Sequence, residues 1–170
     1  MDLKKEIRDI PDFPKEGVIF KDITPLLKNP AALKYAIDAI ANHYVEEMVD
    51  LVLGAEARGF IIGGALAYRL NAGFIPARKP GKLPHNVTSA EYALEYGMDS
   101  LEMHRDAINQ GDKILVVDDV LATGGTASAK VELVKKLGGE VVGIAFLIEL
   151  TFLNGRHKLE GHDVFSLIQY

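Results

Sequence analysis

The 170-residue chain has no cysteine, and no apolar run in it approaches the ~20 residues needed to span a membrane. Without cysteine there is no disulfide, no thiolate zinc site and no cysteine nucleophile, a composition that suits a reducing compartment. Residues 1–9 are mostly charged, so they do not resemble a signal peptide. We therefore expect a cytoplasmic protein that does not interact with a membrane.

Basic residues are scarce relative to acidic ones. The sequence contains 19 Lys and Arg against 24 Asp and Glu, which gives a formal net charge of −5. Binding to DNA or RNA depends on basic side chains that neutralise phosphates, so we expect no nucleic-acid partner. One small polyphosphate still suits such a protein if a few cations converge on it. The length fits a single domain over residues 1–170, and the 48% hydrophobic content supports a core.

Turn-forming residues near the N-terminus precede one clear amphipathic helix. Residues 3–8 are expected to form a short helix, and residues 10–28 a structured loop because prolines and a glycine interrupt them. Asn29 and Pro30 are a typical N-cap and first helical residue. Apolar residues then recur at helical spacing through Val45 and Met48, which predicts a helix over that stretch.

Two strand–helix–strand units follow in the pattern of apolar residues. Their expected elements are strand 51–54, helix 59–70 and strand 74–77, then strand 114–117, a helix after Gly125 that ends near Leu137, and strand 141–148. Continuous Val, Ile and Leu runs are typical of parallel strands buried on both faces. The predicted fold is α/β with a mostly parallel central sheet flanked by helices. Ligands should bind beyond the carboxyl ends of its strands.

A basic loop and a hairpin are expected between the two units. Residues 78–87 are basic and rich in proline and glycine. An alternation of period two, with Tyr92 and Leu94 on one face, predicts a half-exposed strand. Residues 97–100 are expected to turn this strand into a second one at residues 101–105.

The segment after strand 114–117 carries the strongest chemical signal. Asp118 and Asp119 end a buried apolar strand, and a loop of small and hydroxyl residues with Gly124 and Gly125 then opens a helix. A helix N-terminus offers unpaired N–H groups and a partial positive charge, which suit a phosphate. Two carboxylates beside a phosphate would repel it unless they bind sugar hydroxyls or magnesium. The pattern therefore predicts a sugar phosphate; the alternative is a solvated strand–turn–helix that binds nothing.

Residues 114–126 resemble the motif that binds phosphoribosyl pyrophosphate (PRPP) in the type I phosphoribosyltransferases. Nearly the whole chain is similar to the adenine-specific members of that family. The similar segments are residues 12–25, 54–60, 78–84, 92–97 and 148–150. The most specific of them are Glu-Gly-Val-Ile-Phe-Lys-Asp-Ile, at residues 16–23, and Arg-Lys-Pro-Gly-Lys-Leu-Pro, at residues 78–84.

The resemblance implies where each part of PRPP binds. Asp118 and Asp119 would contact the ribose hydroxyls. The 5′-phosphate would lie among Ala122, Thr123, Gly124, Gly125 and Thr126. The pyrophosphate would lie near Ala55, Glu56, Ala57, Arg58, Arg78, Lys79 and Lys82. Arg78 is implied to reach the site of a second subunit, which predicts a homodimer.

The resemblance also implies where the base binds and what removes its proton. Residues 10–28 would form a hood over adenine, with Ile19, Phe20 and Lys21 on one side of the base and Leu150 on the other. Without the resemblance, Phe20 is ordinary core. Residues 78–106 would supply the basic loop and a mobile hairpin lid. The lid would carry the catalytic residues, Glu95 as the general base and Tyr96 as a residue that closes the site.

The implied reaction transfers the 5-phosphoribosyl group from PRPP to adenine and releases AMP and pyrophosphate. Magnesium is implied as a cofactor that PRPP holds, with no direct protein ligand expected. The five histidines show no metal-ligand spacing on one helix, so we interpret them as structural or surface residues. Two alternatives stay open: a PRPP-sensing regulator of the same fold, and an enzyme that uses xanthine or hypoxanthine.

Overall fold

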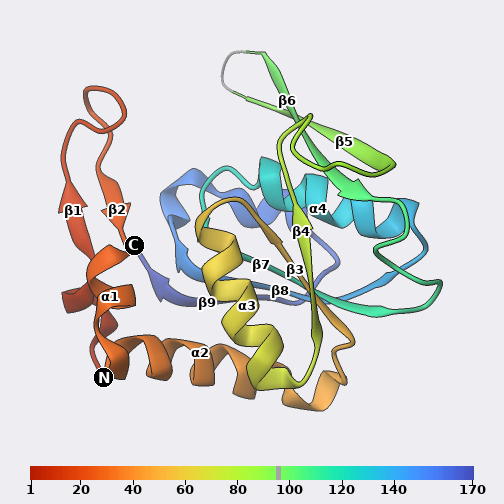
Figure 1. Cartoon of the computed structure of the whole chain (residues 1–170). Coiled ribbons are helices and arrows are strands. Elements are labelled where there is room, and N and C mark those ends of the chain that lie inside the picture. Colours follow the sequence, from red (N-terminus) through yellow and green to blue (C-terminus); the bar gives the residue numbers. More distant parts are fainter. Residues whose placement is uncertain (95–96) are drawn as a thin grey trace.

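The computed structural model describes residues 1–94 and 97–170 and has a five-stranded parallel sheet at its centre (Figure 1). The strand order is β4-β3-β7-β8-β9, and every neighbouring pair is parallel. This sheet confirms the predicted α/β class. The strands are β3 (Leu51–Ala55), β4 (Gly73–Ala77), β7 (Lys113–Leu121), β8 (Glu140–Glu149) and β9 (Val164–Gln169).

Helices cover both faces of the sheet (Figure 1). The first face packs on α2 (Pro30–Tyr44) and α3 (Arg58–Leu70), and the second on α4 (Gly125–Lys136). Alternate residues of β7 serve the two cores, with Leu115 and Val117 in the first and Ile114 and Val116 in the second. Because α3 links β3 to β4 on one face and α4 links β7 to β8 on the other, the chain diverges between β3 and β7. Such a divergence leaves a crevice at the carboxyl ends of the strands.

The N-terminal region differs from the sequence prediction. The expected helix over residues 3–8 is a 3₁₀ turn, η1 (Leu3–Glu6), followed by strand β1 (Arg8–Ile10). The expected loop over residues 10–28 contains β2 (Phe20–Asp22), antiparallel to β1, and α1 (Thr24–Lys28). Asp22 stabilises the strand pair and the start of α1, because it accepts hydrogen bonds from Arg8 at 2.6 Å and from Thr24 N at 2.9 Å. The prolines conceal these elements in the sequence, although proline is tolerated in the first turn of a helix.

The amphipathic helix begins as predicted and ends earlier. Asn29 caps α2 by accepting hydrogen bonds from the amides of Ala31 and Ala32. The helix stops at Tyr44, and the 3₁₀ turn η2 (Val45–Glu47) follows. Met48 has a left-handed backbone with φ of 50° and is 71% exposed, so the expectation that the helix reaches it is wrong.

Strand β7 runs four residues beyond the predicted end at Val117. The expectation that Asp118 and Asp119 follow the strand is wrong, because Asp118 pairs with Phe146 and Val120 with Ile148 in β8. The partner strand supplies backbone hydrogen bonds, which outweigh the low strand propensity of aspartate. The edge strand β9 had no prediction; it follows two 3₁₀ turns, η3 (Thr151–Leu153) and η4 (Gly155–Leu159).

A hairpin of β5 (Val87–Ala93) and β6 (Met98–His104) lies over α4 at the top of Figure 1. Its second strand begins three residues before the predicted residue 101, because Ala93 pairs with Met98. Tyr92 packs against the core, whereas Leu94 is past the end of β5 and 48% exposed. Glu95 and Tyr96 lie outside the described residues. No helix within residues 1–94 and 97–170 is long and apolar enough to cross a membrane.

Candidate active site

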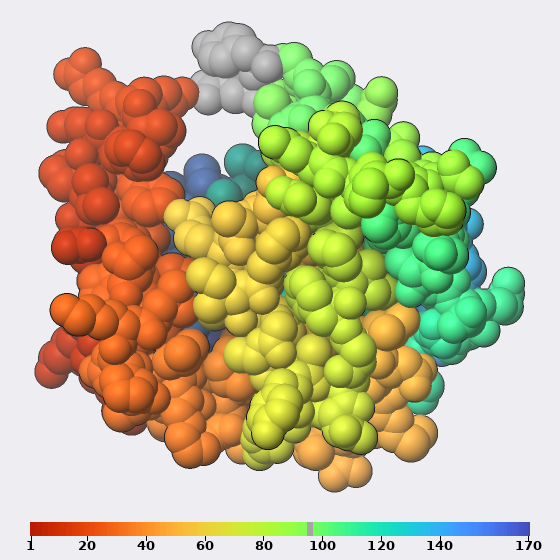
Figure 2. All heavy atoms as spheres, viewed as in Figure 1, coloured from red at the N-terminus to blue at the C-terminus, as the bar shows by residue number. Residues whose placement is uncertain are grey.

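A cleft of about 360 Å³ opens beyond the carboxyl ends of β3 and β7. Figure 2 shows a hollow between the hood, in red and orange, and the hairpin, with teal and blue atoms at its floor. The cleft brings residues of the predicted adenine, pyrophosphate and ribose sites together. Its lining consists of Val18, Ile19, Phe20, Lys21, Ala55, Glu56, Arg58, Asp118, Asp119, Val120, Ala122, Thr126 and Leu150.

A smaller cavity of about 70 Å³ adjoins the cleft at the loop of residues 122–126, here called the phosphate loop. Thr123, Gly124 and Gly125 line this cavity, and Asp118 lines both spaces. Gly124 has φ of +83°, and a Cβ atom there would lie 2.4 Å from the carbonyl oxygen of Gly155. Only glycine therefore lets the loop lie against η4 and leave its N–H groups free to face the cavity.

Two carboxylates separate the phosphate loop from the hood. The Asp119 side chain is buried, and Arg58 Nε lies 2.5 Å from its Oδ2 atom, although the two are not aligned as a hydrogen bond. Burial raises the pKa of Asp119 to about 6, the neighbouring charge of Asp118 adds to the shift, and Arg58 opposes it. Asp118 has a different partner, because Lys130 Nζ donates to its Oδ2 atom at 2.6 Å.

The turn between β3 and α3 approaches these carboxylates closely. A Cβ atom on Gly59 would lie 2.8 Å from Asp118 Oδ1, so a side chain at the start of α3 would force the Asp118 carboxylate to move. The peptide bond between Glu56 and Ala57 in this turn is cis. Arg58, the first residue of α3, opposes the helix dipole by its position, and its contact with Asp119 offsets that effect.

Glu56 ties the same turn to the basic loop. Its carboxylate accepts hydrogen bonds from Lys79 N at 2.7 Å and from Arg78 at 3.2 Å. Burial opposes the ionisation of Glu56, but these donors outweigh it and hold its pKa below the ordinary value. Arg78 also exchanges two backbone hydrogen bonds with Glu102 of β6. Ala57, Arg78, Lys79 and Lys82 do not line the cleft, so the structure places them around it rather than in it.

The basic loop is joined to the hairpin by Lys79. Its ammonium group donates to the hydroxyl of Tyr92 at 2.7 Å and makes a short contact with Asp99. The hydrogen bond from Lys79 lowers the pKa of Asp99 below its ordinary value. One lysine that was predicted to lie near pyrophosphate is therefore held by the hairpin in this structure.

The hood forms the apolar wall of the cleft. The guanidinium carbon of Arg58 lies 4.9 Å from the centre of the Phe20 ring, and Phe13 packs edge-on against that ring at 5.2 Å. The Lys21 side chain is engaged elsewhere, with Asp9 at 2.7 Å and over the Tyr170 ring at 3.7 Å. Lys21 therefore presents its main chain, not its ammonium group, to a ligand in the cleft.

Comparisons with known proteins identify this arrangement. Residues 22–167 match the phosphoribosyl transferase domain family. An adenine phosphoribosyltransferase of Halothermothrix orenii is 62% identical over 169 residues, which is 99% of each chain. The chain belongs to the adenine phosphoribosyltransferase family.

Solved structures of the family agree with this assignment. The adenine phosphoribosyltransferase of Thermoanaerobacter pseudethanolicus superposes with a TM-score of 0.97 at 55% identity, covering 99% of this chain and 98% of the other. That of Saccharomyces cerevisiae, in complex with an imino-altritol bisphosphate and adenine, gives 0.92 at 41% identity, covering 97% and 96%.

Some residues around the site were not foreseen from the sequence. Lys130 is one, and its signal was a charged residue on the apolar face of a helix. Arg156 is another: it donates two hydrogen bonds to Glu149, next to Leu150, at 2.8 and 2.7 Å. This pair fixes the segment that contacts the phosphate loop at Gly155.

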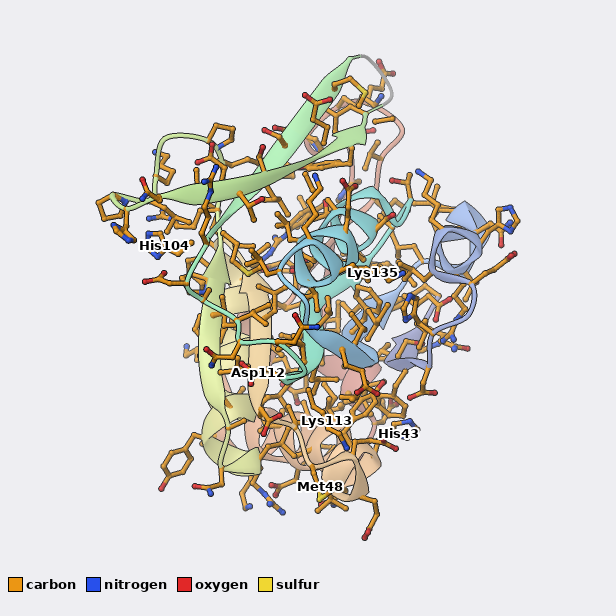
Figure 3. All side chains as sticks on the ribbon, turned by 90° about the vertical axis from the view of Figure 1, so that its right-hand side faces the viewer. His43, Met48, His104, Asp112, Lys113 and Lys135 are labelled. Carbon is orange, nitrogen blue, oxygen red and sulfur yellow. The ribbon has the colours of Figure 1, made fainter. Side chains whose placement is uncertain are left out.

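The described residues contain no group of three or more acidic, histidine or cysteine side chains that could hold a metal ion. His43 and Met48 lie at the end of the molecule opposite the hairpin (Figure 3). His43 lies 3.2 Å from Asp163 and stacks on Phe165, so its role there is structural.

Proposed function

We propose that this protein transfers the 5-phosphoribosyl group of PRPP to adenine, giving AMP and pyrophosphate in purine salvage. The observation that carries the proposal is one cleft in which an apolar wall, a carboxylate pair and a phosphate loop lie next to one another. The yeast relative was solved with a sugar bisphosphate analogue and adenine together. An adjoining base and sugar phosphate are what the cleft can accommodate.

The phosphate loop and the carboxylate pair would hold the ribose 5-phosphate part of PRPP. Ala122, Thr123 and Gly124 lead into α4, and Gly125 and Thr126 are its first residues, where free N–H groups and the helix dipole favour a phosphate. Asp118 and Asp119 would accept hydrogen bonds from the two ribose hydroxyls. A hydrogen bond to a charged acceptor contributes about 1.5–3 kcal/mol, so these contacts matter for affinity.

The pyrophosphate would bind at the turn between β3 and α3. Ala55, Glu56, Ala57 and Arg58 form this turn, and the basic loop with Arg78, Lys79 and Lys82 lies beside it. Lys79 would exchange its contact with Asp99 for a phosphate oxygen when the substrate arrives. Arg58 would likewise add its charge to the pyrophosphate end of the cleft.

Magnesium fits as an ion that the substrate holds. The described residues offer two adjacent carboxylates but no complete cage, and Mg²⁺ commonly binds phosphate oxygens and water with few protein ligands. Bound in this way, the ion offsets the negative charge that develops on the leaving pyrophosphate. The contribution of the chain is to place PRPP, with Asp118 and Asp119 directed to its ribose.

Adenine would lie between the Phe20 ring and Leu150, both of which line the cleft. Main-chain groups of Ile19 to Lys21 would recognise its edge, since the Lys21 side chain points to Asp9. Stacking of an aromatic ring on a base contributes roughly 1–3 kcal/mol. The ring nitrogen of adenine then attacks the anomeric carbon as the bond to pyrophosphate breaks.

The site must exclude water during this step, because a cationic sugar would otherwise be hydrolysed. The hairpin is the proposed lid, and its contact through Lys79 links it to the pyrophosphate side of the site. Glu95 is the proposed base that removes the adenine proton, with Tyr96 helping to close the site. Both residues lie outside the described part of the chain, and their roles rest on the family resemblance.

The test is to incubate the protein with PRPP, Mg²⁺ and each purine base in turn. We expect AMP from adenine and much less mononucleotide from guanine, hypoxanthine or xanthine. IMP or XMP formed as readily as AMP would instead support the alternative base specificity. PRPP binding without turnover of any base would support the regulator. We also propose that the protein is a homodimer and is cytoplasmic. A cytoplasmic location is proposed because a sequence without cysteine suits a reducing compartment.

A further inference from the structure

Lys130 is a fully buried lysine in the middle of α4, with 0% of its surface exposed. It lies on the apolar face of the helix among Ala127, Leu133 and Val134, all of them buried. A lysine is almost never buried in this way unless its charge is paired, because removing an ammonium group from water is strongly unfavourable. Packing alone would favour an apolar side chain here, so the ammonium group needs another explanation.

The ammonium group of Lys130 reaches the carboxyl end of β7. Its Nζ atom donates hydrogen bonds to the carbonyl oxygen of Val117 at 2.7 Å and to Asp118 Oδ2 at 2.6 Å. The second bond is charge-assisted, and such bonds are shorter and stronger than neutral ones. The lysine therefore supports the site carboxylate from inside the protein.

The other oxygen of Asp118 is also restrained. Oδ1 accepts a hydrogen bond from Asp119 N at 3.1 Å and lies next to Gly59, where a Cβ atom would approach to 2.8 Å. The Asp118 side chain is half-buried and lines both the cleft and the phosphate cavity. Contacts on both oxygens leave the carboxylate a single orientation toward the space where the ribose would lie.

The charges around the pair are balanced by residues from two helices. Asp118 faces Lys130 from α4, and Asp119 faces Arg58 from α3. We infer that Lys130 is a positioning residue that holds the Asp118 carboxylate in its orientation toward the ribose hydroxyls of PRPP. This inference rests on the proposed role of Asp118 as a ribose ligand.

The first test is the variant Lys130→Met, which keeps the length of the side chain and removes its charge. KM for PRPP and the Kd of PRPP measured by titration calorimetry should both rise roughly tenfold or more, as expected for a weakened charged acceptor. KM for adenine should change little, since Lys130 contacts no residue of the hood. PRPP affinity like that of the unchanged protein would overturn the inference.

Two variants in the same helix are matched controls. Lys135→Met removes an exposed lysine of α4, marked in Figure 3, whose ammonium group lies 3.5 Å from His162 Nε2. Leu133→Ala removes buried packing from α4 without touching Asp118. Both should bind PRPP normally. If Leu133→Ala weakened PRPP binding as much as Lys130→Met, the effect would come from helix packing and the inference would fail.

The double variant Asp118→Asn/Lys130→Met shows whether the lysine acts through Asp118. Its PRPP affinity should be close to that of Asp118→Asn alone, because the acceptor has already been changed; independent, multiplying losses would contradict the inference. Normal PRPP binding by Asp118→Asn would instead refute the proposed role of Asp118. A loss in Asp118→Asn without one in Lys130→Met would refute only the role of Lys130.

Folding defects have a separate readout. If Lys130→Met does not fold, Lys130→Gln serves in its place, since the amide can still donate to Val117 O without a charge. If neither folds, the double variant decides. Its recovery of the folded state would show that the two charges compensate each other, and its failure to fold would show that Lys130 serves packing and overturn the inference.

Discussion

At the scale of single residues, Asp119 is ionised at neutral pH although its buried surroundings disfavour the charge. Burial raises its pKa from 3.8 to about 6. Such a group binds more protons in the folded than in the unfolded protein between these values, so the stability falls as the pH rises from about 4 to 6. At neutral pH the ionised Asp119 therefore reduces stability, by at most about 3 kcal/mol.

We expect Asp119→Asn to raise the melting temperature of the ligand-free protein by a few degrees at pH 7.5 and to change it little at pH 4. Thermal unfolding at both pH values measures this directly. Asp22→Asn provides the opposite case, because hydrogen bonds from Thr24 and Arg8 hold the pKa of Asp22 below its ordinary value. That variant should be destabilised above about pH 4. A melting temperature lowered by Asp119→Asn at pH 7.5 would contradict the expectation.

Glu95→Gln should reduce the rate of the chemical step about tenfold or more, as the loss of a general base does. PRPP affinity should change little, since Glu95 is proposed to act only on adenine. Single-turnover kinetics is the appropriate measurement, because slow product release can hide a slower chemical step. Glu91→Gln, an exposed residue of β5, is the control. Equal small effects of the two variants would remove Glu95 from the mechanism.

Site residues that lie within one short sequence motif could be predicted from the sequence. Asp118, Asp119 and Gly124 lie within a few residues of one another, and their types alone indicate a sugar phosphate. The partners of these residues could not be found in this way. Lys130 and Arg58 come from two helices that the fold brings together, and helical periodicity indicates a buried face without showing what lies across from it.

At the scale of elements, the phosphate loop depends on the turn η4. The contact between Gly124 and Gly155 joins two segments separated by about thirty residues of sequence, and it leaves no room for a side chain on either glycine. The loop therefore has a rigid support that is not evident from its own sequence.

Gly124→Ala should lower both stability and PRPP affinity, because it combines a left-handed backbone with a Cβ atom 2.4 Å from Gly155 O. Gly111→Ala is the matched control, with φ of +84° and no atom within 4 Å of the added Cβ. It should show only the backbone term, about 1–2 kcal/mol. Chemical unfolding and PRPP titration of both variants separate the two effects. Equal losses of stability would show that the contact with Gly155 is unimportant.

The inner strands and the helices between them could be predicted because their apolar runs are long. The residues at which they end were predicted less accurately: β7 continues through two aspartates because β8 provides hydrogen-bond partners beside them. The edge strand β9 and the β1–β2 pair were missed for a related reason. β1 and β2 have only three residues each, and β9 lies at the edge of the sheet. All three depend on partners far away in the sequence, such as Arg8 for Asp22.

At the scale of the whole molecule, we predict a homodimer in which Arg78 acts on the site of the partner subunit. Sedimentation velocity should give a dimer, and a fully active monomer would refute the prediction. Co-expression of Asp118→Asn with Arg78→Gln tests the shared site. A hybrid dimer would contain one intact site, so about a quarter of the normal activity should return after random pairing. If Arg78 acts within its own subunit, no hybrid site is intact and no activity returns.

The starts of α3 and α4 lie on opposite faces of the sheet and border the same cleft. PRPP carries phosphate at both ends of its sugar. Under the proposed function, the start of α4 binds one of these ends and the start of α3 binds the other. When the bond at the anomeric carbon breaks, the 5′-phosphate of AMP stays at α4 and the pyrophosphate stays at α3. Each product then has an anchor of its own. Neither product then has to displace the other in order to bind again.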